Sequence, residues 1–314
     1  MLSFIARRLV QSAAVLLIMS FIVYGLMGLM PGDPIDLMIT SDPKLTPADA
    51  ARLKALYGLD QPLLSRYGAW LGAALQGDFG YSRLHARPVL DVLGPRLANT
   101  LVLMGLSLAC AFAIALPAGI FAASRPYSRR GGLINLIAFA GISMPPFWLA
   151  ILLIILFAVK LRLLPASGMG SGGLPDLALH LALPVMTLTL ATVGAQLRYV
   201  RASMIDALRQ DYIRTARAKG VGAMQLLYGH ALRNAMIPIV TILALDFGSL
   251  FSGALITETM FAYLGMGKTI YDAILGSDYN LAMVGLLLAT VTVLLANLAA
   301  DLAYAALDPR VRLK

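Results

Sequence analysis

The stretch AYLGMGKT at residues 262–269 ends in a glycine, lysine and threonine run that is typical of loops wrapping nucleotide phosphates. Such a loop requires Gly-x-x-x-x-Gly-Lys-Ser/Thr between a strand and a helix, because its backbone N–H groups must surround the phosphates. Here Ala262 stands at the place of the first glycine, and a long apolar run comes before the stretch. We therefore expect these glycines to shape a turn and not to bind ATP.

Two acidic residues lie in or beside an apolar run, where a charge is costly. Asp246 interrupts residues 234–257, and a carboxylate at the centre of a membrane helix costs about 2.5–3.5 kcal/mol. It is either a residue of a translocation path or a hydrogen-bond partner of a neighbouring helix. Glu258, the single glutamate, ends the same run. It either contacts a substrate or an external protein, or it caps a helix or pairs with another subunit.

The remaining reactive residue types form no recognisable site. His85, His180 and His230 show no ligand spacing, and Cys110 is the single cysteine. No Ser-His-Asp grouping stands out from the many serines and aspartates. We expect no metal site, no cofactor and no catalytic residue in this chain.

The composition is that of a membrane protein, with 59% hydrophobic and only 13% charged residues, against about 25% charged in soluble domains. A membrane helix needs about 20 apolar residues, and six segments are long enough. These are residues 9–30, 97–124, 131–159, 177–197, 234–257 and 279–300. The sequence therefore predicts an all-α, polytopic membrane protein with six transmembrane helices.

The positions of lysine and arginine predict the orientation of these helices, because basic residues collect on the cytoplasmic side. Arg7, Arg8, the loop RPYSRR at residues 125–130, residues 198–233 and the tail RVRLK would share that side. Both termini are then cytoplasmic. The net charge of +9 follows this membrane pattern, so nucleic-acid binding is not expected.

Residues 31–96 are expected on the outer side as a helical segment. Thr46, Pro47 and Gly58 are typical of the start and stop of a short helix at residues 47–57. The stretch PLLSRYGAWLGAALQG at residues 62–77 predicts a second, amphipathic helix that ends at Gly77. Such a segment either caps the membrane domain or docks a soluble partner.

Prolines are expected to interrupt two of the spans. Pro145 and Pro146 remove helix hydrogen bonds within the third, and Pro184 does so early in the fourth. A break of this kind survives where neighbouring helices or an aqueous cavity satisfy the freed carbonyls. Pro145 and Pro146 therefore serve packing or line a pathway.

The loop between the fourth and fifth spans carries a charged, helix-forming piece that stops at Gly220. The small side chains of Ala216 and Ala218 would let the backbone of another protein come close, while Arg214, Arg217 and Lys219 keep the surface solvated. If the loop only anchored the helix ends on the cytoplasmic side through positive charge, this would explain the basic residues but not the alanines or the glycine. Docking to a cytoplasmic partner explains all of these features.

Motifs along nearly the whole chain resemble the permeases of bacterial ABC importers in the dipeptide, oligopeptide and nickel class. In order these are FIARRL, PGDP, YGLDQPLLSRYGAWL, GDFGYS, ISMPPFWLA, YIRTARAKG, HALRNAMIP, TETMFAYLGMGK and LDPRVR. In the general importer pattern an acidic residue and two alanines precede a glycine. Here Arg214, Thr215 and Ala216 hold those places before Gly220, as is typical of this class.

The resemblance implies a permease subunit that forms half of a translocation path in the bacterial inner membrane. The implied partners are a homologous second permease, two cytoplasmic ATP-binding subunits that hold ATP and Mg²⁺, and a periplasmic or lipid-anchored solute-binding protein. The coupling residues are Asp211, Tyr212, Arg214, Thr215, Ala216, Arg217, Ala218, Lys219 and Gly220. The candidate residues of the translocation path are Pro145, Pro146, Asp246 and Glu258.

The predicted organisation has three parts: residues 1–30 with the first span, the periplasmic segment 31–96, and a permease core 97–314 with the coupling loop 199–236. Peptides are the expected substrate, with nickel or another small solute as the alternative. A secondary transporter driven through Asp246 is a rival, but it predicts inverted repeats and several intramembrane charges. A membrane-embedded enzyme would require a catalytic cluster.

Overall fold

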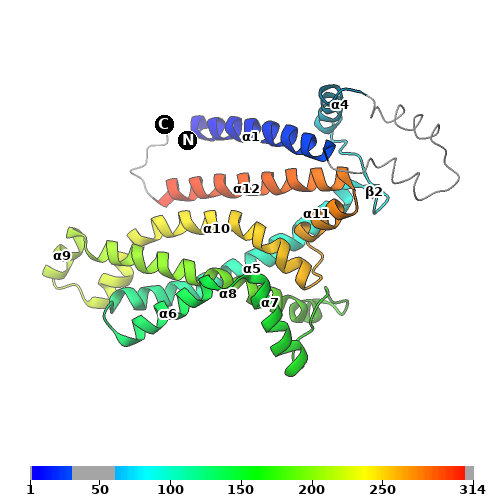
Figure 1. Cartoon of the computed structure of the whole chain (residues 1–314). Helices are drawn as coiled ribbons and strands as arrows, with labels where there is room; N and C mark the ends of the chain where they lie inside the picture. The colour runs from blue at the N-terminus through cyan, green and yellow to red at the C-terminus, as the bar shows by residue number, and fades with distance from the viewer. Residues whose placement is uncertain (1, 30–60, 308–314) are drawn as a thin grey trace. The chain divides into compact units, whose positions relative to one another are not determined.

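The computed structural model describes residues 2–29 and 61–307, and most of them are helical (Figure 1). The elements in chain order are α1 (Leu2–Gly28), α4 (Leu63–Leu75), β1 (Tyr81–Ser82), β2 (Arg87–Pro88), α5 (Val89–Ser124), α6 (Arg129–Ser143), α7 (Pro146–Leu153), the π-helix η1 (Ile154–Lys160), α8 (Leu174–Leu208), α9 (Asp211–Ala218), the π-helix η2 (Gln225–Ala231), α10 (Leu232–Met260), α11 (Met266–Leu275) and α12 (Tyr279–Leu307).

The apolar runs identify the membrane-spanning helices, which confirms the all-α polytopic class. Five described helices are long and apolar enough to cross a membrane, and the pair of α6 with α7 and η1 adds a sixth if it counts as one span. Several helices extend past the predicted apolar windows. For example, α8 continues to Leu208 beyond residue 197, because hydropathy marks only the apolar part of a helix.

The third span is broken at its prolines. Helix α6 ends at Ser143, Met144 and Pro145 are extended with ψ of 124° and 138°, and α7 begins at Pro146. The two halves meet at a bend of 101°. The prediction that these prolines remove helix hydrogen bonds is confirmed, and the helix of the third span is fully interrupted there. Pro184, by contrast, lies inside the continuous helix α8.

The described residues divide into two compact units, and one of them contains residues 99–268 and 293–307. Within it α8 packs against α6, α7 and α10. The approach of α6 to α8 is close because Gly194 has no side chain, and a Cβ there would overlap the carbonyl oxygen of Ala138. Large apolar side chains on α6 and α7, such as Leu136, Ile137 and Trp148, remain exposed, as expected of surfaces in contact with lipid.

The other unit contains, among the described residues, 2–29, 61–98 and 269–292. Aromatic residues join α4 to α1: the ring centroids of Phe21 and Tyr67 are 5.2 Å apart, and the Tyr67 hydroxyl lies 2.8 Å from Oγ of Ser20. The predicted helix at residues 62–77 is thus confirmed, and Gly77 ends it with φ of +87°. The predicted helix at residues 47–57 lies outside the described residues, and the three-part division of the chain stays a prediction.

A short hairpin in this second unit is held by a buried aspartate. Strands β1 and β2 pair antiparallel. The Ser82 hydroxyl donates to Oδ2 of Asp278 at 2.6 Å, and the Leu84 N–H donates to the same oxygen at 2.9 Å. Asp278 stands directly before α12 and also accepts the N–H of Leu281 at 3.3 Å. One carboxylate therefore caps α12 and fixes the hairpin.

The close packing of α6 on α8 yields a stability prediction. Gly194→Ala should lower the free energy of unfolding by about 1–3 kcal/mol, because the added methyl group must push the α6 backbone away. Thermal unfolding of the purified protein in detergent measures this.

Gly105→Ala is the matched control, because Gly105 of α5 has open space where a Cβ would stand. It should leave stability unchanged or raise it by up to about 1 kcal/mol. Equal unfolding temperatures for the two variants would contradict the close approach of α6 to α8.

Candidate functional site

Helix α9 is a short, polar helix between α8 and η2, and residues at both of its ends favour its start and its stop. Asp211 stands in its first turn and Arg217 in its last, each of the sign that the helix dipole favours. At the C-terminal end Gly220 has φ of +80°. The N–H of Gly220 donates to Arg217 O at 3.0 Å and that of Val221 to Ala216 O at 3.2 Å, which is the Schellman arrangement. The predicted glycine stop is confirmed.

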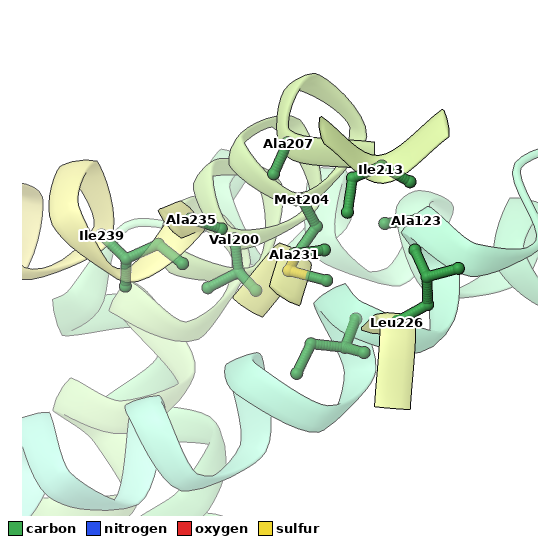
Figure 2. Packing of buried hydrophobic residues seen from close by; sticks show 10 residues of the cluster. Ala123, Val200, Met204, Ala207, Ile213, Leu226, Ala231, Ala235 and Ile239 are labelled. Atoms are coloured by element: carbon green, nitrogen blue, oxygen red, sulfur yellow. The ribbon is translucent and has the colours of Figure 1, made fainter. Parts of the chain in front are cut away.

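One side chain of α9 seats the helix on the rest of its unit. Ile213 is only 1% exposed. It belongs to a hydrophobic cluster drawn from the ends of four other elements, which we call the seat cluster (Figure 2). Its members are Ile120 and Ala123 of α5, Val200, Met204 and Ala207 of α8, Ile213 of α9, Leu226 and Ala231 of η2, and Ala235 and Ile239 of α10. The seat cluster therefore connects α9 to three long helices, α5, α8 and α10.

The opposite face of α9 is exposed and carries a net positive charge. Its exposed members are Asp211, Tyr212, Arg214, Thr215, Arg217, Ala218, Lys219 and Gly220. Arg214 pairs with Asp211 one turn earlier, but both side chains are largely exposed, so this ion pair adds little stability. This face therefore presents basic groups around the small, exposed side chain of Ala218.

The structure corrects the interpretation of Ala216. The sequence predicted that Ala216 and Ala218 both face another protein. Ala216 lies one turn after Ile213 on the same face and is buried by its own chain. Its small side chain therefore faces the rest of its own unit, and of the two alanines only Ala218 is exposed.

The π-helix η2 links α9 to α10. Leu226 and Ala231 of η2 are buried in the seat cluster, and the N–H of Leu226 donates to Gly222 O at 2.9 Å. A π-helix is rare and is frequent at functional sites. The connection from α9 to α10 is thus helical and packed, not a loose loop.

Asp246 lies in the middle of α10 and interacts with Gln196 of α8. Gln196 is 2% exposed, and the contact falls short of the geometry of a full hydrogen bond. Of the two expectations for Asp246, this contact supports the polar link between neighbouring helices. Its role in a translocation path stays a prediction.

Glu258 is fully buried near the end of α10, at the opposite end of that helix from η2. Its Oε1 accepts the Thr100 hydroxyl at 2.5 Å, and its Oε2 accepts the Lys268 N–H at 2.9 Å. Lys268 lies in the first turn of α11, so Glu258 caps that helix. In this conformation its carboxylate is not accessible to a substrate, and its assignment to the path stays a prediction.

The same contacts explain the stretch that resembles a phosphate loop. The N–H groups of Gly267 and Lys268, which such a loop would offer to a nucleotide, are bonded to Glu258 of the same chain. The stretch is an anion-binding turn at a helix N-terminus, and its anion is a side chain.

The structure places the other predicted residues apart from these. Pro145 and Pro146 form the break between α6 and α7, and His85 and His180 lie in different units. Among the described residues no three His, Cys, Asp or Glu side chains lie together in a way that would hold a metal ion.

Three contributing residues were missed by the sequence reasoning. Ile213 had a signal, since residues 213 and 216 are apolar at helical spacing in an otherwise polar stretch. Thr100 and Gln196 had none, because their partners are distant in sequence, as with the 158 positions that separate Thr100 from Glu258.

Comparison with known proteins identifies the family. Residues 115–313 match the family described as binding-protein-dependent transport system inner membrane component, and residues 1–104 match the N-terminal family of the same systems. This chain belongs to that family of transport permeases.

Individual relatives align over the full length of the permease. It is 38% identical over 316 residues to the oligopeptide transport system permease protein AppB of Bacillus subtilis strain 168, which covers 99% of both chains. It is 37% identical over 314 residues to the glutathione transport system permease protein GsiC of Escherichia coli strain K12, which covers all of both chains. These relatives are transport permease subunits.

A solved structure shares the fold. An inward-facing structure of the MetNI methionine ABC transporter matches with a TM-score of 0.59 and 19% sequence identity, covering 70% of this chain and 97% of that one. The permease therefore has the fold of a membrane subunit of an ABC transporter.

The seating of α9 can be tested by proteolysis. Ile213→Ala removes buried methyl groups and should destabilise the packed position of α9 by about 2–5 kcal/mol. When the cleavage rate is proportional to the fraction of molecules in which α9 has left the seat cluster, trypsin should cut the variant after Arg214 and Arg217 at least about ten times faster than the parent.

Thr215→Ala is the control, since the Thr215 hydroxyl is exposed and bonds only to the α9 backbone, at Asp211 O. Its cleavage rate should stay close to that of the parent. Equal rates for the Ile213→Ala variant and its parent would show that the seat cluster does not hold α9.

Proposed function

We propose that this permease forms half of the translocation path of an ATP-binding-cassette importer for peptides, and that α9 is the helix that docks onto a cytoplasmic ATP-binding subunit. The observation that carries the proposal is the construction of α9. One face is locked into the seat cluster through Ile213, and the other face is exposed and polar. A subunit bound to the exposed face would transmit its movement to α5, α8 and α10.

The distribution of basic residues supports a cytoplasmic position for α9. The seat cluster brings the last turn of α5, which contains Ala123, beside the end of α8 and α9. Arg125, Arg129 and Arg130 directly follow that turn, and Arg209, Arg214, Arg217 and Lys219 lie at or in α9. Basic residues gathered at one end of membrane helices mark the cytoplasmic side. On this orientation both termini are cytoplasmic.

The substrate proposal rests on the names of the relatives. AppB is named for oligopeptide transport and GsiC for glutathione transport, and glutathione is itself a short peptide. Both align over essentially the entire chain. Nickel or another small solute remains the alternative, because an external binding protein selects the substrate in systems of this kind.

The proposed partners follow from the family. Its description as binding-protein-dependent implies a solute-binding protein outside the membrane. A homologous second permease would complete the path, and two ATP-binding subunits would hold ATP and Mg²⁺. An ion-driven transporter would need neither the binding protein nor the exposed face of α9.

We keep Asp246 and the Pro145–Pro146 break as candidates for the path. Asp246 interacts with Gln196 across α8 and α10, and the break frees backbone carbonyls within a span. Both features occur in membrane proteins where polar solutes pass.

Copurification and uptake test the proposed function. The permease, expressed with its partner subunits, should copurify with ATP-binding subunits, and reconstituted vesicles should accumulate a labelled peptide presented with the binding protein. Uptake should stop when ATP is replaced by a non-hydrolysable analogue. Uptake that persists with the analogue and follows an ion gradient would establish the rival.

The glycine after α9 gives a sharper test. Gly220→Leu forces a side chain into a left-handed conformation that costs about 1–2 kcal/mol, although the surrounding space is open. We expect the end of α9 to change shape, so that peptide uptake falls about ten-fold while ATP hydrolysis by the assembled importer continues.

Gly222→Leu is the matched control, because this glycine also has open space but does not have positive φ. It should transport normally. Gly220→Asn should fall between the two, since asparagine tolerates the left-handed region better than leucine. Normal uptake by the Gly220→Leu variant would contradict the role of α9 in coupling.

A further inference from the structure

We propose that Glu258 and Thr100 are positioning residues for transport, which hold α5, α10 and the start of α11 together as one rigid joint throughout the transport cycle. This inference rests on the proposed function as an importer. The joint consists of Thr100, Glu258 and the turn at residues 263–268.

Each polar group at the centre of the joint has a partner from a different element. The Thr100 hydroxyl of α5 donates to Oε1 of Glu258 at 2.5 Å and accepts the Met266 N–H at 2.8 Å. Oε2 of Glu258 accepts the Lys268 N–H at 2.9 Å. Thr100, Glu258 and Met266 are each fully buried. The carboxylate thereby links α5, α10 and the N-terminus of α11.

Two glycines make room for the carboxylate. A Cβ on Gly265 would overlap the carboxyl group of Glu258. A Cβ on Gly267 would stand 2.8 Å from Cα of Leu255 and 3.0 Å from Oε2 of Glu258. The glycines of GMGK are therefore needed because the carboxylate and the α10 backbone come so close.

A second set of bonds fixes the same turn to α5 and α10. The Tyr263 hydroxyl donates to Asn99 O at 3.0 Å, and Nδ2 of Asn99 donates to Leu264 O at 2.8 Å. The Tyr263 N–H donates to Glu258 O at 2.8 Å. Burial, with a smaller contribution from the Glu258 charge, raises the pKa of Tyr263 to about 12, so its hydroxyl stays a donor at physiological pH.

Opening this joint would be costly. It would leave a buried carboxylate and several buried N–H groups without partners, and each such group carries a large desolvation penalty. The carboxylate also stabilises the N-terminus of α11 through the helix dipole. Motion that starts at α9 should therefore carry α5, α10 and the start of α11 together instead of separating them here.

Thiol labelling tests whether the joint stays closed. In a Cys110→Ser background, Met266→Cys places a thiol at a fully buried position, and Leu264→Cys places one at a position that is 42% exposed. In the assembled importer, a membrane-impermeant maleimide should label the Leu264→Cys variant and not the Met266→Cys variant, both at rest and during ATP turnover. Adding Glu258→Gln should make Met266→Cys reactive. Labelling of Met266→Cys during turnover in the chain that retains Glu258 would overturn the proposal.

Transport by hydroxyl variants tests the positioning role. Thr100→Val keeps the side-chain shape but removes the bond to the carboxylate. We expect peptide uptake per assembled complex to fall about ten-fold, the loss that corresponds to one charge-assisted hydrogen bond. Thr100→Ser should restore uptake to within about two-fold of the parent, because a hydroxyl is again present. Thr259→Ala is the control, since that hydroxyl is exposed and bonds only to Leu255 O.

The outcomes separate this proposal from the proposed function. Uptake per complex by the Thr100→Val variant equal to that of the parent would overturn the positioning role. Absence of ATP-dependent peptide uptake by the parent chain would contradict the proposed importer function. In that case the labelling of Met266→Cys, with and without Glu258→Gln, would still show whether Glu258 closes the joint.

Discussion

The burial of Ile213 in the seat cluster is the interaction on which the functional account depends. A polar eight-residue helix has little stability in isolation, because its formation costs more than its few hydrogen bonds return. Tertiary packing must hold it, and Ile213 provides that packing through the seat cluster, whose other members come from α5, α8, η2 and α10. Since these elements end at the same cluster, α9 is joined to the membrane helices as a stiff unit and can transmit a displacement.

Much of the fold followed from the sequence because its signals are local. Apolar runs located the spans, Pro145 and Pro146 located the break in the third, and Gly220 located the end of α9. The bend of 101° after α6 was not predictable, since it depends on what α7 packs against. The burial of Ala216 was not predictable either, because it depends on which elements α9 packs against. The charge pattern of the loop does not specify those elements.

The stretch GMGKT shows why a motif needs its structural context. Glycines before a helix allow the backbone N–H groups to approach an anion closely, and this geometry is the same whether the anion is a phosphate or a carboxylate. Here Glu258 supplies the carboxylate from the preceding helix, and Thr100 completes the site from α5. Ala262 at the place of the first glycine predicted that the stretch does not bind a nucleotide, but the identity of the anion depended on contacts between distant parts of the chain.

The most direct test of the account is whether α9 touches an ATP-binding subunit in the intact importer. A cysteine introduced at Ala218, on the exposed face of α9, in a Cys110→Ser chain should form a cross-link to an ATP-binding subunit through a short bifunctional maleimide. It should also be inaccessible to a reagent applied from the periplasmic side. Labelling from the periplasmic side, or a complete complex that forms no such cross-link, would contradict the account.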